Sequence, residues 1–408
     1  MNRNLRETLA DWPQGKHFPR FLVDLMRAEL ARLRPGANLP SSWPDADADA
    51  DLGVDSLEQL NLAIAVSTAL CFAQGRRPDA LQSKRSFNEW LGEARAVLMA
   101  APGAFLGKPG DLCFKTSGST GEPRFITHDF AALAQEVDEL ASLFGGAERV
   151  VTSIPSHHIY GFLFTILLPR RLGAEVLDAR GNSPASLAAL LRPGDLVIAF
   201  PTIWEAAAQA GVAWPMGVTG VTSGAPCPSD AAREIRAKGL GRFVEIHGST
   251  ETGGIGWRDD PAAGFQLFPF WSKQDEDRIG KDFGMGMRLF ELPDVVAWDG
   301  ADRLAPQRRR DGAVQVAGVN VYPDFVRAVI SAHPEVAGAA VRLMRPGEGM
   351  GLKAFVTLRR AECDLPAFRL VLENWLRQRL NAAQMPRAIS FGPELPRTEG
   401  GKPADWAI

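Results

Sequence analysis

A glycine- and hydroxyl-rich run at residues 115–124 is the part of the sequence with the clearest capacity for chemistry. The run reads KTSGSTGEPR and directly follows a short apolar stretch. Its glycines let backbone amides point outward as an anion nest, the hydroxyls add donors, and Arg124 adds a positive charge. We interpret the run as a polyphosphate-binding loop, although a polar hairpin without a ligand has a similar composition. The candidate phosphate-binding residues are Thr116, Ser117, Gly118, Ser119, Thr120, Gly121 and Arg124.

Residues 245–253 form a second polar run, which contains a carboxylate suited to magnesium. The run reads EIHGSTETG. Mg²⁺ in proteins is usually held by one or two carboxylates together with phosphate oxygens, so Glu251 is a candidate metal ligand beside a bound nucleotide. A Ser-Thr-Glu sequence taken alone is also a frequent helix cap, and the run is therefore ambiguous without a second motif.

These two runs, in this order, resemble motifs of the adenylate-forming superfamily, which includes acyl-CoA synthetases, peptide-synthetase adenylation domains and luciferases. The first run matches the superfamily's phosphate loop nearly residue for residue, and the second resembles its aromatic-Gly-x-Thr-Glu motif. The resemblance implies that Thr250 contacts phosphate and that Glu251 binds Mg²⁺. His247 stands at the aromatic position, which lines the acyl and adenine pocket, and Gly248 follows it.

Two segments between these runs match further motifs of the superfamily. Residues 155–161 read PSHHIYG and resemble the motif that gates the acid pocket, with His158 at the position of its histidine or aromatic residue. Residues 223–226 resemble the segment on which adenine rests. The residues of that segment expected to contact the nucleotide are Gly224, Ala225 and Pro226. Both assignments depend on the resemblance, because a single histidine is usually structural and Ser-Gly-Ala-Pro is an ordinary turn.

Residue spacing supplies another match. The superfamily places a ribose-binding Asp fifteen residues before an Arg that contacts ribose or phosphate, with a hinge residue two positions later. Asp294, Arg309 and Asp311 have these spacings. A carboxylate that accepts hydrogen bonds from two ribose hydroxyls is favourable charge-assisted chemistry, whereas an exposed arginine alone would simply be solvated.

The C-terminal residues 395–402 read LPRTEGGK and reproduce the superfamily's Pro-Arg-Thr-x-x-Gly-Lys motif. The resemblance makes Lys402 the residue that neutralises the charge developing between the acid carboxylate and the α-phosphate of ATP. A solvated lysine near the end of the chain is the alternative interpretation. One departure from the pattern is Gln315, which stands where many relatives carry lysine.

The resemblance implies two half-reactions, with ATP and Mg²⁺ as cofactors. A carboxylic acid first attacks Mg·ATP to give acyl-AMP and pyrophosphate. A small C-terminal domain then rotates about a hinge near Asp311, so that the thiol of CoA or of an acyl carrier protein can attack the adenylate. The proportions of the chain indicate a compact ligase, similar to those of aryl-polyene and related pigment pathways. The leading hypothesis for the substrate is a small aromatic acid such as a hydroxybenzoate.

Residues 52–57 read LGVDSL and reproduce the attachment motif of acyl carrier proteins. In a carrier protein, Ser56 would bear phosphopantetheine, exposed at a helix N-terminus where a phosphate is well placed. Three interpretations stay open: a carrier that the ligase loads itself, a carrier-like element that replaces a missing subdomain, or an ordinary helix start preceded by Asp. The helix that follows lacks the acidic face that carrier-modifying enzymes recognise.

Apolar periodicity predicts the elements that position these motifs. Residues 18–100 show helical spacing. Short apolar runs then alternate with helical stretches, which is typical of a layered α/β domain with a largely parallel sheet. Together with the resemblances above, this periodicity predicts three regions: a helical acyl-carrier-protein-like segment at residues 1–104, an ATP- and acid-binding adenylation core at residues 105–311, and a small mobile α+β domain at residues 312–408.

Composition limits the other function classes. The chain has 408 residues and a net charge of −3, so it can bury large cores but has no broad field favouring nucleic acid or a membrane surface. No apolar stretch approaches the ~20 residues of a spanning helix. Four widely separated cysteines argue against a zinc site or a disulfide framework and favour the cytoplasm. A non-catalytic scaffold is the remaining alternative, because Arg124, His247 and Gln315 depart from the motifs.

Overall fold

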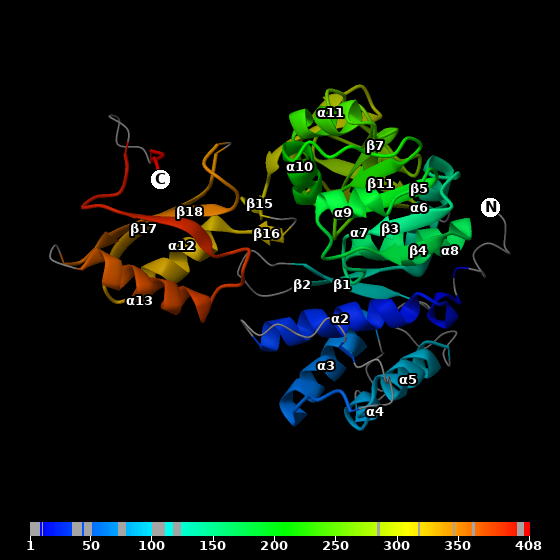
Figure 1. Cartoon of the computed structure of the whole chain (residues 1–408), viewed down its shortest axis with the longest axis horizontal. Coiled ribbons are helices and arrows are strands. Elements are labelled where there is room, and N and C mark those ends of the chain that lie inside the picture. The colour runs from blue at the N-terminus through cyan, green and yellow to red at the C-terminus, as the bar shows by residue number, and fades with distance from the viewer. Residues whose placement is uncertain are drawn as a thin grey trace. The chain divides into compact units, whose positions relative to one another are not determined.

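The computed structural model divides the chain into two compact units (Figure 1). The large unit comprises residues 1–116 and 125–307, and the small unit comprises residues 117–124 and 308–408. The domain boundaries predicted after residues 104 and 311 stay predictions. The structure describes residues 9, 11–34, 43–44, 51–71, 79–99, 111–116, 124–283, 286–316, 319–345, 347–360, 364–397 and 404–408.

Helices dominate the described residues of the first quarter of the chain. Their bounds are η1 (Trp12–Gln14, a 3₁₀ turn), α2 (Phe18–Leu33), α3 (Ser56–Ala69), α4 (Asp79–Gln82) and α5 (Phe87–Met99). The apolar residues that α2 buries recur at helical spacing, namely Phe18, Phe21, Leu22, Met26 and Leu30. A capping box starts α3, because Asp55 accepts from the Glu58 amide and Glu58 accepts from the Asp55 amide.

A nine-stranded sheet forms the centre of the large unit. β4, β3, β5, β6 and β7 run parallel to one another, and β8, β9 and β14 continue the sheet through antiparallel pairs. The carboxyl ends of the parallel strands meet at one edge, where open α/β sheets usually bind ligands. In spatial order the strands are β13 (Asp294–Asp299), β14 (Arg303–Arg309), β9 (Phe265–Leu267), β8 (Gly253–Arg258), β7 (Arg242–Ser249), β6 (Thr219–Thr222), β5 (Asp195–Ala199), β3 (Arg149–Thr152) and β4 (Glu175–Asp178).

Helices cover both faces of this sheet. Neighbouring residues of one strand point into opposite apolar clusters, as Val150 and Val151 do in β3. One cluster contains residues of α6 (Phe130–Leu143), α7 (Ile159–Phe162), the π-helix η2 (Leu163–Leu167) and α8 (Leu168–Leu172). The other contains residues of α9 (Pro184–Ala189), α10 (Pro201–Gln209) and α11 (Ser229–Ala237). A parallel sheet buried on both faces is the layered architecture that the sequence predicts.

Two smaller sheets complete the large unit. β1 (Leu112–Thr116) and β2 (Arg124–His128) form a two-stranded sheet on either side of the predicted phosphate loop. β10 (Trp271–Lys273), β11 (Arg278–Asp282) and β12 (Met287–Glu291) form an antiparallel three-stranded sheet.

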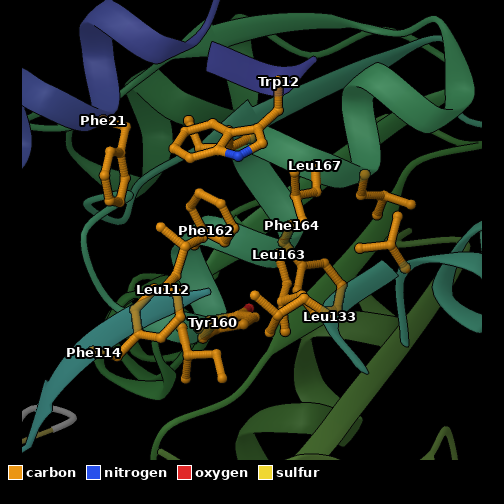
Figure 2. Close-up of a cluster of buried hydrophobic side chains, with 14 of the residues drawn as sticks. Trp12, Phe21, Leu112, Phe114, Leu133, Tyr160, Phe162, Leu163, Phe164 and Leu167 are labelled. Carbon is orange, nitrogen blue, oxygen red and sulfur yellow. The ribbon is translucent and has the colours of Figure 1, made fainter. Parts of the chain in front are cut away.

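The N-terminal helices share the main core of the large unit. Figure 2 shows Phe162 among aromatic side chains that come from separate parts of the chain. Its ring centroid lies 5.0 Å from Trp12, 5.2 Å from Phe21 and 5.5 Å from Phe114. The first quarter is therefore helical, as predicted, and its apolar side chains are continuous with the core around the sheet. Its likeness to a carrier protein stays a prediction.

The small unit has the α+β character that the sequence predicts. Its elements are β15 (Val314–Val316), β16 (Val319–Val321), α12 (Pro323–Ser331), β17 (Val336–Leu343), β18 (Leu352–Leu358), α13 (Leu365–Arg377) and β19 (Pro386–Phe391). β18 pairs antiparallel with β17 and parallel with β19, and both helices share one apolar cluster with this sheet. Lys353 is fully buried in it, where Glu348 at 2.8 Å and Asp405 at 3.0 Å balance its charge.

Three global features bear on the predicted function classes. No helix within the described ranges is both long and apolar enough to cross a bilayer. In the same ranges, no group of three or more His, Cys, Asp or Glu residues could hold a metal ion. Cys71 and Cys113 are free thiols, yet folding brings their Sγ atoms to 2.6 Å from each other, a proximity that their separation in sequence does not indicate.

Candidate active site

The structure describes only part of the predicted site. The residues that fall outside the described ranges are Ser117, Gly118, Ser119, Thr120, Gly121 and Lys402. Thr116 ends β1 and Arg124 begins β2 with an exposed side chain. The strands that flank the predicted phosphate loop are thus in place.

The Ser-Thr-Glu run lies in a turn between β7 and β8, so the interpretation of this run as a helix cap is wrong. Backbone amides of Glu251 and Thr252 donate to the Ser249 hydroxyl at 3.1 and 3.2 Å, and the Ser249 amide donates to the Thr252 hydroxyl. Gly248 permits the close approach of the strands, since a Cβ there would collide with the Gly253 carbonyl. The hydroxyls of Ser249 and Thr252 thus hold the turn together, and Thr250 and Glu251 lie at its tip.

The carboxylate of Glu251 fits a magnesium ligand. Its side chain is exposed, and no described residue forms a hydrogen bond or ion pair with that carboxylate. A single accessible carboxylate at a turn tip suits Mg²⁺, which keeps most of its shell for water and phosphate oxygens.

His128 connects the end of β2 with the same turn. Its Nε2 lies 2.6 Å from the carbonyl oxygen of Thr250. Burial lowers the pKa of His128 to about 4, so the imidazole is neutral at pH 7 and its Nε2–H must be the donor. Sequence reasoning did not single out this histidine. The only available signal was its position at the end of the strand that follows the predicted phosphate loop.

The structure brings His247 and Asp294 together, although 46 residues lie between them in the chain. The His247 Nε2 lies 3.5 Å from the Asp294 carboxylate, and both side chains are largely buried. The His247 ring also packs against Phe265, with 5.2 Å between ring centroids. The predicted pocket-lining residue and the predicted ribose-binding carboxylate therefore belong to one local cluster.

The predicted adenine-binding turn follows β6 at the same edge of the sheet. Gly224 has a φ of +87°, which favours glycine, and the Phe200 ring would contact a Cβ placed there. The Ser223 hydroxyl donates to the Ile246 carbonyl at 2.9 Å, and the Cys227 amide donates to Glu245 at 3.1 Å. These two bonds fasten both ends of the turn to β7, so Gly224, Ala225 and Pro226 lie beside the strand that carries His247.

The predicted gating segment turns sharply between β3 and α7. A Cβ at Gly161 would collide with the Pro155 carbonyl, so only glycine allows the start of α7 to lie this close to Pro155. The rings of His157 and His158 lie 4.1 Å apart. Surrounding protein desolvates the His158 imidazole and lowers its pKa, although the side chain still reaches solvent.

In the small unit, the predicted nucleotide-binding Arg309 pairs with the predicted hinge residue Asp311. Their closest atoms lie 2.6 Å apart, and the Tyr322 hydroxyl donates to the same carboxylate at 3.0 Å. Burial alone would raise the pKa of Asp311, but hydrogen bonds from Arg309, Ala313 and Tyr322 outweigh burial and lower the pKa. The carboxylate is therefore ionised and holds the guanidinium of Arg309 in place.

Comparison with known proteins decides the family. A family model described as AMP-binding enzyme matches residues 72–291, which is more than half of the chain, and the AMP-binding enzyme C-terminal domain matches residues 326–402. The chain belongs to the AMP-binding enzyme family. This assignment confirms the predicted adenylate-forming superfamily, the predicted fold class and the predicted activity of an AMP-forming acid–thiol ligase.

Full-length relatives have the same compact proportions. A 4-coumarate–CoA ligase of Rhodobacter capsulatus is 37% identical over 402 residues, which cover 95% of this chain and 99% of the relative. A 4-coumarate–CoA ligase of Halorhodospira halophila is 33% identical and covers 94% of this chain and 97% of the relative. Since residues 1–104 make up about a quarter of the chain, these alignments must include most of the helical first quarter.

Solved structures of other adenylate-forming enzymes share the fold of the ligase. An amide bond synthetase from Marinactinospora thermotolerans has a TM-score of 0.60 at 19% identity, and covers 94% of this chain and 92% of that chain. An o-succinylbenzoate CoA synthetase from Bacillus subtilis has a TM-score of 0.59 at 20% identity and covers 72% of this chain and 67% of that one. At these identities the likeness supports the fold alone.

A buried carboxylate that the sequence did not indicate, Glu136, contacts the start of β8, which follows the Thr250–Glu251 turn of the ligase. Glu136 of α6 accepts from the Gly254 amide at 2.8 Å, and the Trp271 indole donates to the Gly254 carbonyl at 2.7 Å. A Cβ at Gly254 would lie 2.6 Å from this carboxylate. Burial raises the pKa of Glu136 to about 7, while the nearby Lys281 and the Gly254 amide act in the opposite direction.

This pKa shift predicts a pH dependence of stability. Between pH 4.5 and about 7, the folded state keeps a proton on Glu136 that the unfolded state releases, so the free energy of unfolding falls as pH rises. Glu136→Gln is expected to remove this loss, which is on the order of 3 kcal/mol. Calorimetric Tm values at pH 5 and pH 7.5 test it, with the exposed Glu148→Gln as control. A wild-type Tm that falls no further than that of Glu136→Gln contradicts the prediction.

Proposed function

We propose that the ligase joins a hydroxycinnamic acid of the 4-coumarate type to CoA through an acyl-AMP intermediate. The observation that carries this proposal is the end-to-end similarity to relatives named 4-coumarate–CoA ligase, at 37% and 33% identity. The sequence alone favoured a small aromatic acid such as a hydroxybenzoate. The relatives favour an aromatic acid with a longer side chain, and they favour CoA over a carrier protein as the acceptor.

In the first half-reaction, an oxygen of the acid carboxylate attacks the α-phosphorus of ATP, and the bond to the bridging oxygen of pyrophosphate breaks. Asp294 would accept hydrogen bonds from the ribose hydroxyls, and Thr250 would donate to phosphate. Mg²⁺, which Glu251 would hold, neutralises phosphate charge when it is bound. His128 supports this step indirectly, because it fixes the carbonyl of Thr250 and thereby the tip of the turn.

In the second half-reaction, the CoA thiol attacks the acyl carbonyl, loses its proton and displaces AMP. We infer that residues 312–408 act as the mobile domain and that Asp311 is the hinge residue. The ion pair of Arg309 with Asp311 would be one of the contacts that a hinge rotation rearranges. Lys402 would serve the first half-reaction and leave the site for the second.

We propose a structural role for Ser56 in place of phosphopantetheine attachment. Ser56 is the exposed first residue of α3, and the capping box accounts for the Asp55 that precedes it and for Glu58. The helix that Ser56 begins packs into the main core, where its residues Leu62, Ala63 and Val66 are fully buried. After co-expression with a phosphopantetheinyl transferase, mass spectrometry should detect no gain of ~340 Da, the mass of phosphopantetheine. Such a gain on Ser56 would favour the self-loading alternative.

Acid-dependent ATP–pyrophosphate exchange tests the substrate class. The panel comprises 4-coumarate, caffeate, cinnamate, 4-hydroxybenzoate, acetate and a long-chain fatty acid, each with Mg·ATP. Hydroxycinnamates are expected to support the fastest exchange and to give a CoA thioester when CoA is added. Preference for a hydroxybenzoate or an aliphatic acid would overturn the proposed acid. If none of the acids in the panel supports exchange, the result would favour a non-catalytic scaffold.

A further inference from the structure

Asp24, in the N-terminal helix α2, is buried against the predicted gating segment. Its side chain is fully buried. The Asp24 carboxylate accepts two hydrogen bonds from Ser156, a residue 132 positions later in the chain. The Ser156 amide donates at 2.7 Å and the Ser156 hydroxyl at 2.6 Å, both to the same oxygen of Asp24. The start of the gating segment is therefore held by a residue from the first quarter of the chain.

An arginine neutralises this buried carboxylate. Arg180, which follows β4, donates from Nη1 to the second oxygen of Asp24 at 2.5 Å and also pairs with Asp178. A buried carboxylate is tolerated only when it is paired and its lone pairs are satisfied, and both conditions hold here. The Asp24 charge also acts on His158, because it opposes the desolvation that lowers the pKa of that imidazole.

The same helix also reaches Gly161, the last residue of the gating segment, through Thr165 of η2. Arg20 lies one turn before Asp24 in α2, so both side chains project from one face of the helix. Arg20 donates to the carbonyl oxygen of Thr165 and, at 2.7 Å, to its hydroxyl. The Thr165 hydroxyl in turn donates to the Gly161 carbonyl at 2.6 Å. Two residues of α2 thus bracket the stretch from Ser156 to Thr165 that carries His158.

We propose that Asp24 is a positioning residue for acid binding: it holds the gating segment so that His158 faces the acid, with Arg20 securing the far end. The inference rests on the proposed function, because that function gives the segment its role at the acid site. It also assigns a task to the first quarter of the chain. Residues of α2 would form the supporting wall of the acid pocket, as a compact substitute for a larger subdomain.

Kinetics of Asp24→Asn test this proposal. The acid KM in pyrophosphate exchange is expected to rise roughly 10- to 100-fold, the usual cost of misplacing a binding group, while the ATP KM changes little. Ser156→Ala keeps the pair of Asp24 with Arg180 and should raise the acid KM by roughly 2- to 10-fold. Asp195→Asn is the matched control, since the buried Asp195 carboxylate pairs with Arg149 at 2.6 Å elsewhere in the large unit. This control is expected to leave the acid KM unchanged.

Two further measures keep the test decisive. If Asp24→Asn does not fold, Ser156→Ala alone decides, and an unchanged acid KM overturns the proposal. If either variant lowers kcat but leaves the acid KM unchanged, the proposal is also overturned. That result means that the substitution only reduces the fraction of folded, active enzyme. Kinetics use whichever acid the wild type activates best, so a failure of 4-coumarate affects only the proposed function. Hydrogen exchange should in addition rise in residues 155–165 of Ser156→Ala, and unchanged exchange there contradicts the proposal without any substrate.

Discussion

Replacement of Lys402 by alanine is expected to lower acid-dependent ATP–pyrophosphate exchange by roughly 100- to 1,000-fold. This is the usual cost of removing one preorganised donor from the place where charge develops in a transition state. Lys402 ends the Pro-Arg-Thr-x-x-Gly-Lys motif, and the C-terminal family match extends to this residue.

The second half-reaction distinguishes this role from a general loss of folding. Synthetic acyl-AMP supplied to Lys402→Ala should still be converted to the CoA thioester at a rate near that of the wild type. Lys238→Ala removes an exposed lysine that pairs with Glu234 at the end of α11, and it should affect neither half-reaction. Unchanged adenylation in Lys402→Ala would refute the assignment of this lysine.

Replacement of Asp294 by asparagine is expected to raise the KM for ATP roughly 10- to 100-fold. Hydrogen bonds to a charged group contribute about 1.5–3 kcal/mol, and a tenfold change in affinity corresponds to about 1.4 kcal/mol. Asp294 is largely buried and lies 3.5 Å from His247, so loss of its charge is not masked by solvent. An amide in its place keeps the shape but offers one acceptor and no charge.

The matched control for this variant lies on the same strand. Asp299 is the exposed last residue of β13, and Asp299→Asn should leave the KM for ATP unchanged. A thermal melt of Asp294→Asn separates weaker nucleotide binding from lower stability. If the KM for the acid rises while that for ATP does not, Asp294 contacts the acid and the ribose assignment fails.

Much of the chemistry could be predicted because it is local in sequence. The loop at residues 115–124 and the motif at residues 395–402 consist of contiguous backbone amides, glycines and charged side chains. Such runs work through short-range geometry, so their residue types carry most of the information. The alternation of helices and strands was predictable for the same reason, since the periods of 3.6 and 2 residues are local properties.

The ambiguous features were those in which one local pattern serves two structures. The Asp-Ser-Leu sequence at residues 55–57 can mark a carrier attachment site or the start of a helix, because both place a serine at a helix N-terminus. The Ser-Thr-Glu sequence that ends at Glu251 can cap a helix or form a strand-connecting turn. Packing around Phe162 and the pairing of β7 with β8 are the observations that bear on these alternatives.

By itself, the sequence determined the superfamily, the order of the motifs and the residue types available for chemistry. Only the tertiary structure decided which of these residues meet. His128 with Thr250, His247 with Asp294, and Asp24 with Ser156 are each pairs from distant parts of the chain. The physical reason is that burial of polar groups requires partners, and those partners are supplied by whichever strands and helices the apolar core brings together. No periodicity or spacing in the chain encodes these contacts separately from the fold.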